Sequence, residues 1–436
     1  MREGDYPIKE SLSALTRRLR TTPGQMRFAS ATTALMTIVV SVAAIAVLHT
    51  RHDATQALAS VAQPSLLHAS NAYASFSDAD ATASVAFLTG DLDLIYGRSR
   101  YISDLDTATR ELAAISRTAG TTAEIERSIL VINQQLPTYT GLVENARSNN
   151  RQGFPVGPAY LRRASETMRT AILSNVLSIY REEASKLGAA YDSGASQTGP
   201  LFLLGVAAAL IVFMLGVQFW LARRTRRILN LGWLAAAVIV AAVTAAVGVV
   251  IASNSRNLES ARRQGSGATA QLASARILAV RAQADQSLAL IARGSGSSFS
   301  EDFDEVVLRL RGHNQYPGLA AQVRDTLRRL GRSESADRID AELSAFFKEH
   351  QAIAVLEDKG AYPDAIAQTS KSEAPHMDHV VIVLDQEIAA SQRRFTTSIR
   401  DASFDAPIMY LVVGMGAVLV CVFIAAGMYP RLREYR

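Results

Sequence analysis

The sequence predicts an all-α membrane protein with four transmembrane helices and two extracytoplasmic antiparallel four-helix bundles in tandem, in the order span-bundle-span repeated twice. The first observation is a set of four apolar runs, each uncharged and at least 21 residues long. At a helical rise of about 1.5 Å per residue, such a run crosses a hydrocarbon core of about 30 Å. The four runs are residues 28–48, 201–221, 228–251 and 408–428.

The second observation concerns the two long segments between the spans, residues 49–200 and 252–407. Their apolar residues lie three and four positions apart, and they lack the alternating Val, Ile and Thr runs of strands. Breaks at glycine and proline divide each segment into four predicted helices, and we expect the first and last of these to continue into membrane spans. The breaks are Gly90, Gly120 and residues 153–158 in the first segment, and residues 294–296, 313–318 and 360–363 in the second.

Basic residues orient the spans. The leader 1–27, the linker 222–227 and the tail 429–436 hold 13 basic and 4 acidic residues, whereas the rest of the chain holds 32 and 36. The positive-inside rule therefore predicts a multi-pass protein of the plasma membrane with both termini in the cytoplasm and both long segments outside. The same charge asymmetry explains the basic composition without nucleic-acid binding, which requires a basic patch on a folded domain.

The predicted cytoplasmic pieces are small, with 41 residues split three ways. No catalytic domain fits in such pieces, and no nucleophile with a neighbouring base is recognisable in the chain, so we expect neither enzyme activity nor a cofactor. The single cysteine, Cys421, lies within the last span, so the outer segments are expected to fold by packing alone, without disulfides.

Two buried carboxylates are predicted. Asp80 belongs to a stripe with steps of three and four that forms one face of a helix, and a shift of 205 residues aligns Ala79-Asp80 with Ala284-Asp285. Arg281 lies one turn before Asp285. Because an isolated buried charge is very costly, each carboxylate must be paired or protonated. One interpretation is an internal pair that fixes bundle register; the other is a polar pocket whose pairing changes on ligand or partner binding.

Other candidate residues lie near the predicted surfaces. Arg98, Arg100 and Tyr101 are candidate contacts for an extracytoplasmic ligand or partner. His376 and His379 lie one turn apart, but two histidines without further ligands are more typical of a solvated surface, and we predict no metal site.

The leader contains a short amphipathic basic helix, with apolar residues at positions 8, 12, 15 and 19. This helix either lies on anionic lipid or docks a soluble partner, and the linker carries the same ambiguity. The candidate cytoplasmic contacts are Arg17, Arg18, Arg20, Arg223, Arg224, Arg226 and Arg227.

Several short motifs occur in the first outer segment: residues 77–83 (Ser-Asp-Ala-Asp-Ala-Thr-Ala), residues 87–90 (Phe-Leu-Thr-Gly), Arg100-Tyr101 and Asp104-Leu105. Together with the repeated span-bundle-span plan, they make the chain resemble the GlnX family of actinobacterial membrane sensors. The resemblance implies that a solute-binding lipoprotein, loaded with an acidic amino acid or its amide, docks outside. It also implies that a soluble serine/threonine kinase of the protein kinase G type is engaged inside.

Three functions remain open on the sequence. The first is a transmembrane signal-relay sensor with the two partners just named, besides membrane lipid and a possible second copy of the chain. The second is a chemoreceptor-like sensor that binds a small ligand directly in a bundle. The third is a transporter or channel subunit, which the absence of any acidic, basic or histidine residue from the four spans disfavours.

Overall fold

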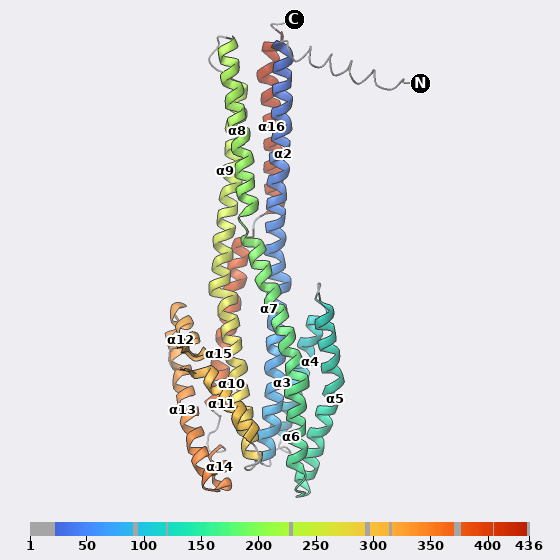
Figure 1. The fold of residues 1–436 in the computed structure, drawn as a ribbon, viewed down its shortest axis with the longest axis vertical. Helices are drawn as coiled ribbons and strands as arrows, with labels where there is room; N and C mark the ends of the chain where they lie inside the picture. The colour runs from blue at the N-terminus through green and yellow to red at the C-terminus, as the bar shows by residue number, and fades with distance from the viewer. Residues whose placement is uncertain are drawn as a thin grey trace, which may run out of the picture. The chain divides into compact units, whose positions relative to one another are not determined.

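The structure, a computed structural model, describes residues 22–89, 95–118, 121–225, 230–292, 297–313, 316–369, 376–403 and 405–433. It is an all-α membrane protein, as the sequence predicts (Figure 1). The described residues divide into two compact units. The span unit takes in those within Met1–Thr55, Asp192–Leu258 and Asp401–Arg436, and the hydrophilic unit takes in those within Gln56–Tyr191 and Glu259–Arg400.

Four helices among the described residues are long and apolar enough to cross a membrane. The four predicted apolar runs lie in α2 (Thr22–Ala57), α8 (Thr198–Thr225), α9 (Leu231–Ser260) and α16 (Ala406–Arg433), apart from residues 228–230 of the third run. Helices α9 and α16 approach closely at two glycines: a Cβ atom added to Gly232 would lie 2.6 Å from the carbonyl oxygen of Phe423 and 2.9 Å from the nitrogen of Gly427. Small residues at such a contact allow the backbones of neighbouring spans to pack tightly.

The described residues of the first outer segment form four helical stretches. They are the π-helical turn η1 (Leu58–Ala62) with α3 (Gln63–Thr89); α4 (Ile95–Ser116); α5 (Ala123–Arg151); and α6 (Gly157–Thr167) with the π-helical turn η3 (Met168–Leu173) and α7 (Ser174–Ala195). Gly153, at φ +72°, lies in the predicted break between α5 and α6. The predicted breaks at Gly90 and Gly120 lie outside the described residues.

The second outer segment has more helices than the four predicted. They are the π-helical turn η4 (Ala261–Ser266) with α10 (Gly267–Ala292), α11 (Ser297–Arg311), α12 (Leu319–Arg329), α13 (Ser333–Asp358), α14 (Tyr362–Thr369) and α15 (His376–Ala402). Gly331, at φ +71°, separates α12 from α13 at a turn that the sequence analysis missed. A small antiparallel pair of strands, β1 (Gly312–His313) and β2 (Tyr316–Pro317), was also not predicted.

The two outer segments pack against each other within the hydrophilic unit. Helices α3 and α10 lie side by side (Figure 1). Ile277, Leu288 and Ile291 of α10 are buried in the apolar core of the first segment, and Leu67 of α3 packs against the core of the second. The two segments therefore share an apolar boundary and form one unit.

The two segments begin alike. Helix α2 passes through η1 into α3, and α9 passes through η4 into α10, with no non-helical residue between them. The π turns begin at Leu58 and Ala261, 203 positions apart, which is close to the shift of 205 that aligns Asp80 with Asp285. Such turns contain an extra residue and occur often at functional positions in helices.

The two segments end differently from the prediction. We expected the last helix of each to continue into a span, but Ser196 and Gln197 separate α7 from α8, and α15 ends at Ala402 before α16 begins at Ala406. Hydrogen bonds within the span unit explain how the freed carbonyl groups are satisfied.

Two buried polar residues, 203 positions apart, supply these hydrogen bonds: Arg51 of α2 and Asn254 of α9. The Arg51 guanidinium donates to the carbonyl oxygen of Ser196 at 2.7 Å, and the Asn254 amide donates to that of Ala402 at 2.8 Å. Arg51 also donates to the Asn254 side-chain oxygen at 3.3 Å. The helix that enters each segment thus binds the chain where the same segment ends, which satisfies carbonyl groups that a broken helix leaves open.

Candidate functional site

Asp80 of α3 lies at the centre of the first segment and is only 2% exposed. Its Oδ1 atom accepts hydrogen bonds from the Ser165 hydroxyl at 2.9 Å and from the Tyr139 hydroxyl at 3.4 Å. Burial raises the pKa of Asp80, whereas the nearby Arg169 and the hydrogen bonds from Ser165 and Tyr139 act to lower it. The carboxylate is therefore held by three other helical elements of its own segment: α5, α6 and η3.

Asp285 of α10 occupies the matching position in the second segment and is fully buried. It forms an ion pair with Arg169, and the Nε atom of Arg281 lies 3.6 Å from its Oδ2 atom. Burial raises the pKa of Asp285 to about 6, against the opposing effect of these two arginines.

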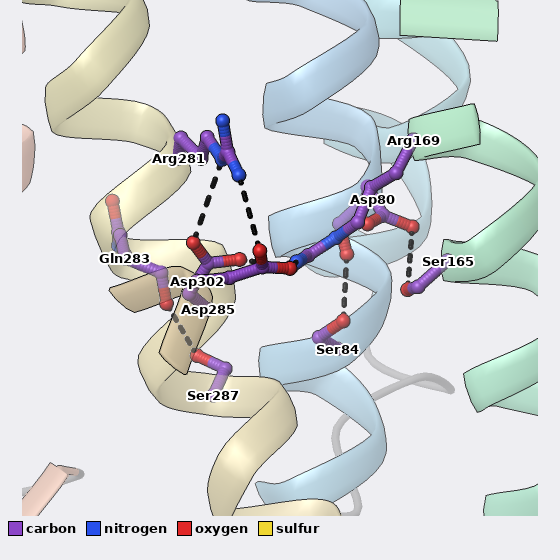
Figure 2. Close-up of polar contacts among 9 residues, drawn as sticks. All are labelled: Asp80, Ser84, Ser165, Arg169, Arg281, Gln283, Asp285, Ser287 and Asp302. Carbon is purple, nitrogen blue, oxygen red and sulfur yellow. Dashed lines mark hydrogen bonds and ion pairs between the residues drawn. The ribbon is translucent and has the colours of Figure 1, made fainter. Parts of the chain in front are cut away.

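Arg169 connects the two carboxylates. It projects from η3 of the first segment, next to Asp80, and reaches Asp285 and Asp302 of the second segment (Figure 2). Its Nη1 atom lies 3.0 Å from the Oδ2 atom of Asp302, and the Oδ1 atom of Asp302 lies 3.5 Å from the Nη2 atom of Arg281. This charge cluster, defined as Asp80, Arg169, Arg281, Asp285 and Asp302, places two arginines among three aspartates.

A cavity of about 200 Å³ lies beside the charge cluster. Its volume exceeds the roughly 30 Å³ that one water occupies in the liquid but is smaller than most drug-sized pockets. Guanidinium groups bind carboxylates and phosphates, and carboxylates bind ammonium groups, so the lining offers polar partners of both signs. Residues of both outer segments line it, among them Tyr73, Ser77, Asp80, Arg169, Arg281 and Asp302.

A second set of polar contacts also joins the segments. Arg276 of α10 donates to the carbonyl oxygen of Ser70 at 3.2 Å and to the side chain of Asn71 at 3.0 Å, and it forms an ion pair with Asp385 of α15. Near it, burial raises the pKa of Asp78 to about 7. Burial also raises the pKa of Asp104 to about 6, opposed by Arg100.

The structure separates the predicted site residues into groups. Asp80, Asp285 and Arg281 meet in the charge cluster, whereas Arg98 and Arg100 lie on α4 and pair with Glu144 and Asp378, each at 3.7 Å. Tyr101 is buried, with its ring centroid 6.4 Å from that of Tyr139.

The predicted cytoplasmic contacts are mostly beyond what the structure describes. The guanidinium of Arg223 lies 4.6 Å from the centre of the Phe219 ring. The other candidates lie outside the described residues; they are Arg17, Arg18, Arg20, Arg226, Arg227 and the side chain of Arg224.

Sequence reasoning missed Arg169, Tyr139, Ser165 and Asp302. One signal was available for Arg169, because it lies one turn after Ser165 and next to Met168, and both of these residues are fully buried. Nothing in the sequence indicates that its partners lie on α10 and α11.

The comparison with protein families bears on this first segment. Residues 54–192 match an actinobacterial sensor domain. The match indicates a sensor or signalling role, and its range contains Asp80 and Arg169 but ends before Asp285. No curated protein matches the chain, and no solved structure matches it either.

We expect the loss of Arg169 alone to destabilise the protein strongly, and more than the loss of both Arg169 and Asp285. Arg169→Leu should lower the free energy of unfolding by up to about 3–5 kcal/mol, because it leaves a buried carboxylate with Arg281 as its remaining partner. The double variant Arg169→Leu/Asp285→Leu should be more stable than Arg169→Leu alone, since neither charge is then left buried. Thermal unfolding of the full chain in detergent, followed by circular dichroism, measures both.

Arg163→Leu is the matched control, because Arg163 lies on α6 and forms an exposed pair with Glu166 at 2.7 Å. It should change the free energy by less than about 1 kcal/mol. Equal losses of unfolding free energy in Arg163→Leu and Arg169→Leu would show that the buried pair stabilises the fold no more than the exposed pair does.

The raised carboxylate pKa values predict that the hydrophilic unit gains stability on mild acidification. The folded state binds protons at Asp78 and Asp285 near pH 7 and 6, whereas the unfolded chain binds them near the ordinary value of 3.8. Lowering the pH from 8 towards 6 therefore protonates the folded state first and raises the free energy of unfolding. The thermal midpoint should rise over this interval.

Asp78→Asn should reduce this rise, whereas Asp106→Asn, at an exposed pair with Arg110, should leave it intact. The histidines are the same in all three proteins, so the difference between the curves is the informative quantity. A curve for Asp78→Asn that coincides with the wild-type curve would contradict the assignment.

Proposed function

We propose that the chain is a transmembrane signal-relay sensor whose hydrophilic unit lies outside the cell as a tandem of two joined bundles. In this proposal the unit recognises an extracytoplasmic solute-binding protein loaded with an acidic amino acid or its amide, in line with the resemblance to GlnX. The cytoplasmic pieces then engage a serine/threonine kinase, and the chain has no enzyme activity of its own. The observation that carries the proposal is the charge cluster, in which Arg169 of one segment is held by carboxylates of the other.

The charge cluster has the groups needed to switch between two arrangements of its ion pairs. Arg169 and Arg281 both contact both Asp285 and Asp302, so the same groups permit several pairings. The adjoining cavity leaves room for side chains to move between them. A partner that binds one pairing better than another shifts the population towards that state, and a coupling of about 1–3 kcal/mol is sufficient for a useful signal.

The helices supply a route for the signal. Helix α3, which carries Asp80, follows α2 through η1, and α10, which carries Asp285, follows α9 through η4. Asp80 and Asp285 therefore stand on helices that continue along the chain into spans. A change of pairing that shifts α3 against α10 would displace these two spans and the basic linker 222–227.

Asp80→Asn tests whether the charge cluster signals. The Asn side chain can keep hydrogen bonds to Ser165 and Tyr139 but carries no charge, so the thermal midpoint should stay within a few degrees of wild type. Signalling should nevertheless fall, measured as phosphorylation of cellular kinase substrates when an acidic amino acid is supplied.

Asp106→Asn, at an exposed position on α4, is the matched control and should signal normally. Normal signalling by Asp80→Asn would remove the charge cluster from the mechanism and leave it a structural role only.

In-cell crosslinking followed by mass spectrometry tests the partners. A soluble kinase should be recovered with the wild-type chain and lost when Arg223, Arg224, Arg226 and Arg227 are changed to Ala. Changing the same four residues to Lys preserves the charge that orients the spans and should preserve membrane topology, checked by protease accessibility. Recovery of no kinase with any of the three proteins would overturn the relay.

The cavity supports a second candidate, a chemoreceptor-like sensor that binds a small ligand directly. With arginine and aspartate side chains in its lining, the cavity is suited to a small zwitterion. Calorimetry with the full chain and a panel of amino acids separates the two. Saturable heat without any binding protein favours direct sensing, whereas heat only with the loaded binding protein favours the relay.

A further inference from the structure

Three potential metal ligands meet on the surface of the second segment: Glu342 of α13 and His376 and His379 of α15. The Nδ1 atom of His376 lies 2.7 Å from Glu342 Oε2, and the Nδ1 atom of His379 lies 3.4 Å from Glu342 Oε1. One potential ligand atom from each residue lies within 4.8 Å of the other two. The sequence offered only the histidine pair, because Glu342 lies 34 residues before His376.

The spacing of these atoms is close to that of a tetrahedral zinc site. With bonds of about 2.0–2.1 Å, the ligand atoms around a tetrahedral Zn²⁺ lie about 3.3 Å apart. The two observed distances, 2.7 and 3.4 Å, reach different oxygens of Glu342 and lie on either side of this value. Small side-chain rotations would therefore bring all three ligands onto one ion.

We propose that Glu342, His376 and His379 form a binding site for Zn²⁺. Two imidazoles and one carboxylate are a typical ligand set for zinc, whereas Ca²⁺ and Mg²⁺ prefer oxygen ligands alone. His376 and His379 also lie at positions i and i+3 in the first turn of α15, so one helix presents both rings on the same side.

The exposure of the three side chains indicates an exchangeable site. His376, His379 and Glu342 are 34%, 46% and 30% exposed, so solvent reaches the ligands and a water completes the coordination. Structural zinc sites, by contrast, are closed by four protein ligands. This site is therefore suited to report the zinc concentration around the hydrophilic unit.

Zinc at this position would act on the contact between the two segments. It would join the first turn of α15 to α13, and Asp378, within that turn, pairs with Arg100 of the first segment at 3.7 Å. Fixing the turn fixes one side of this contact. The inference does not depend on the identity of the sensor's partners.

The test measures Zn²⁺ binding to the full chain, purified in detergent without a polyhistidine tag and stripped with a chelator. Competition with a chromophoric chelator should show one Zn²⁺ per chain, with affinity reduced at least tenfold in His379→Gln and in Glu342→Gln. His313→Gln is the matched control, because His313 is an exposed histidine of the same segment outside the cluster, and it should bind as wild type does.

A second readout is the thermal midpoint, which Zn²⁺ should raise in wild type and His313→Gln but not in the two ligand variants. Circular dichroism verifies that every variant is folded. Ca²⁺ should leave the midpoint unchanged. Absence of Zn²⁺ binding to wild type, or equal binding to all four proteins, would overturn the proposal.

Discussion

The buried ion pair between Arg169 and Asp285 joins the two outer segments of the chain at a buried charge. A buried carboxylate is costly unless it is paired, and Asp285 is fully buried. Its principal partner comes from the other segment, and Asp302 holds the same guanidinium at 3.0 Å. Each segment therefore contributes to the charged core of the other: without Arg169, Asp285 keeps only Arg281, and without the second segment Arg169 loses its ion pairs with Asp285 and Asp302.

The charge cluster is connected to the spans through the helices that carry two of its aspartates. Asp80 and Asp285 stand on α3 and α10, the two helices that follow membrane spans without interruption, and those helices lie side by side. Arg51 and Asn254, on the two entering helices, hydrogen-bond the chain where each segment ends. Pairs of polar residues separated by nearly the same number of positions thus occur both in the charge cluster and in the span unit.

The sequence predicted what depends on local pattern. Uncharged apolar runs indicate the spans, and the three-and-four spacing around Asp80 indicates an inward position, where the structure has it buried. Features that depend on contacts between distant residues could not be predicted: Arg169 and Asp302 are 133 positions apart, and Glu342 joins His376 only through packing of α13 against α15. The turn at Gly331, between α12 and α13, was missed because a single glycine is weak evidence for a turn.

Double electron–electron resonance tests the central claim, that Arg169 holds the two segments together, most directly. Spin labels at the exposed positions Glu124→Cys of α5 and Lys348→Cys of α13, in a Cys421→Ala background, report the distance between the segments. The account predicts a narrow distance distribution for this protein and with Arg163→Leu added, and a broadened or shifted one with Arg169→Leu. An unchanged narrow distribution with Arg169→Leu, in a protein that remains helical, would contradict it.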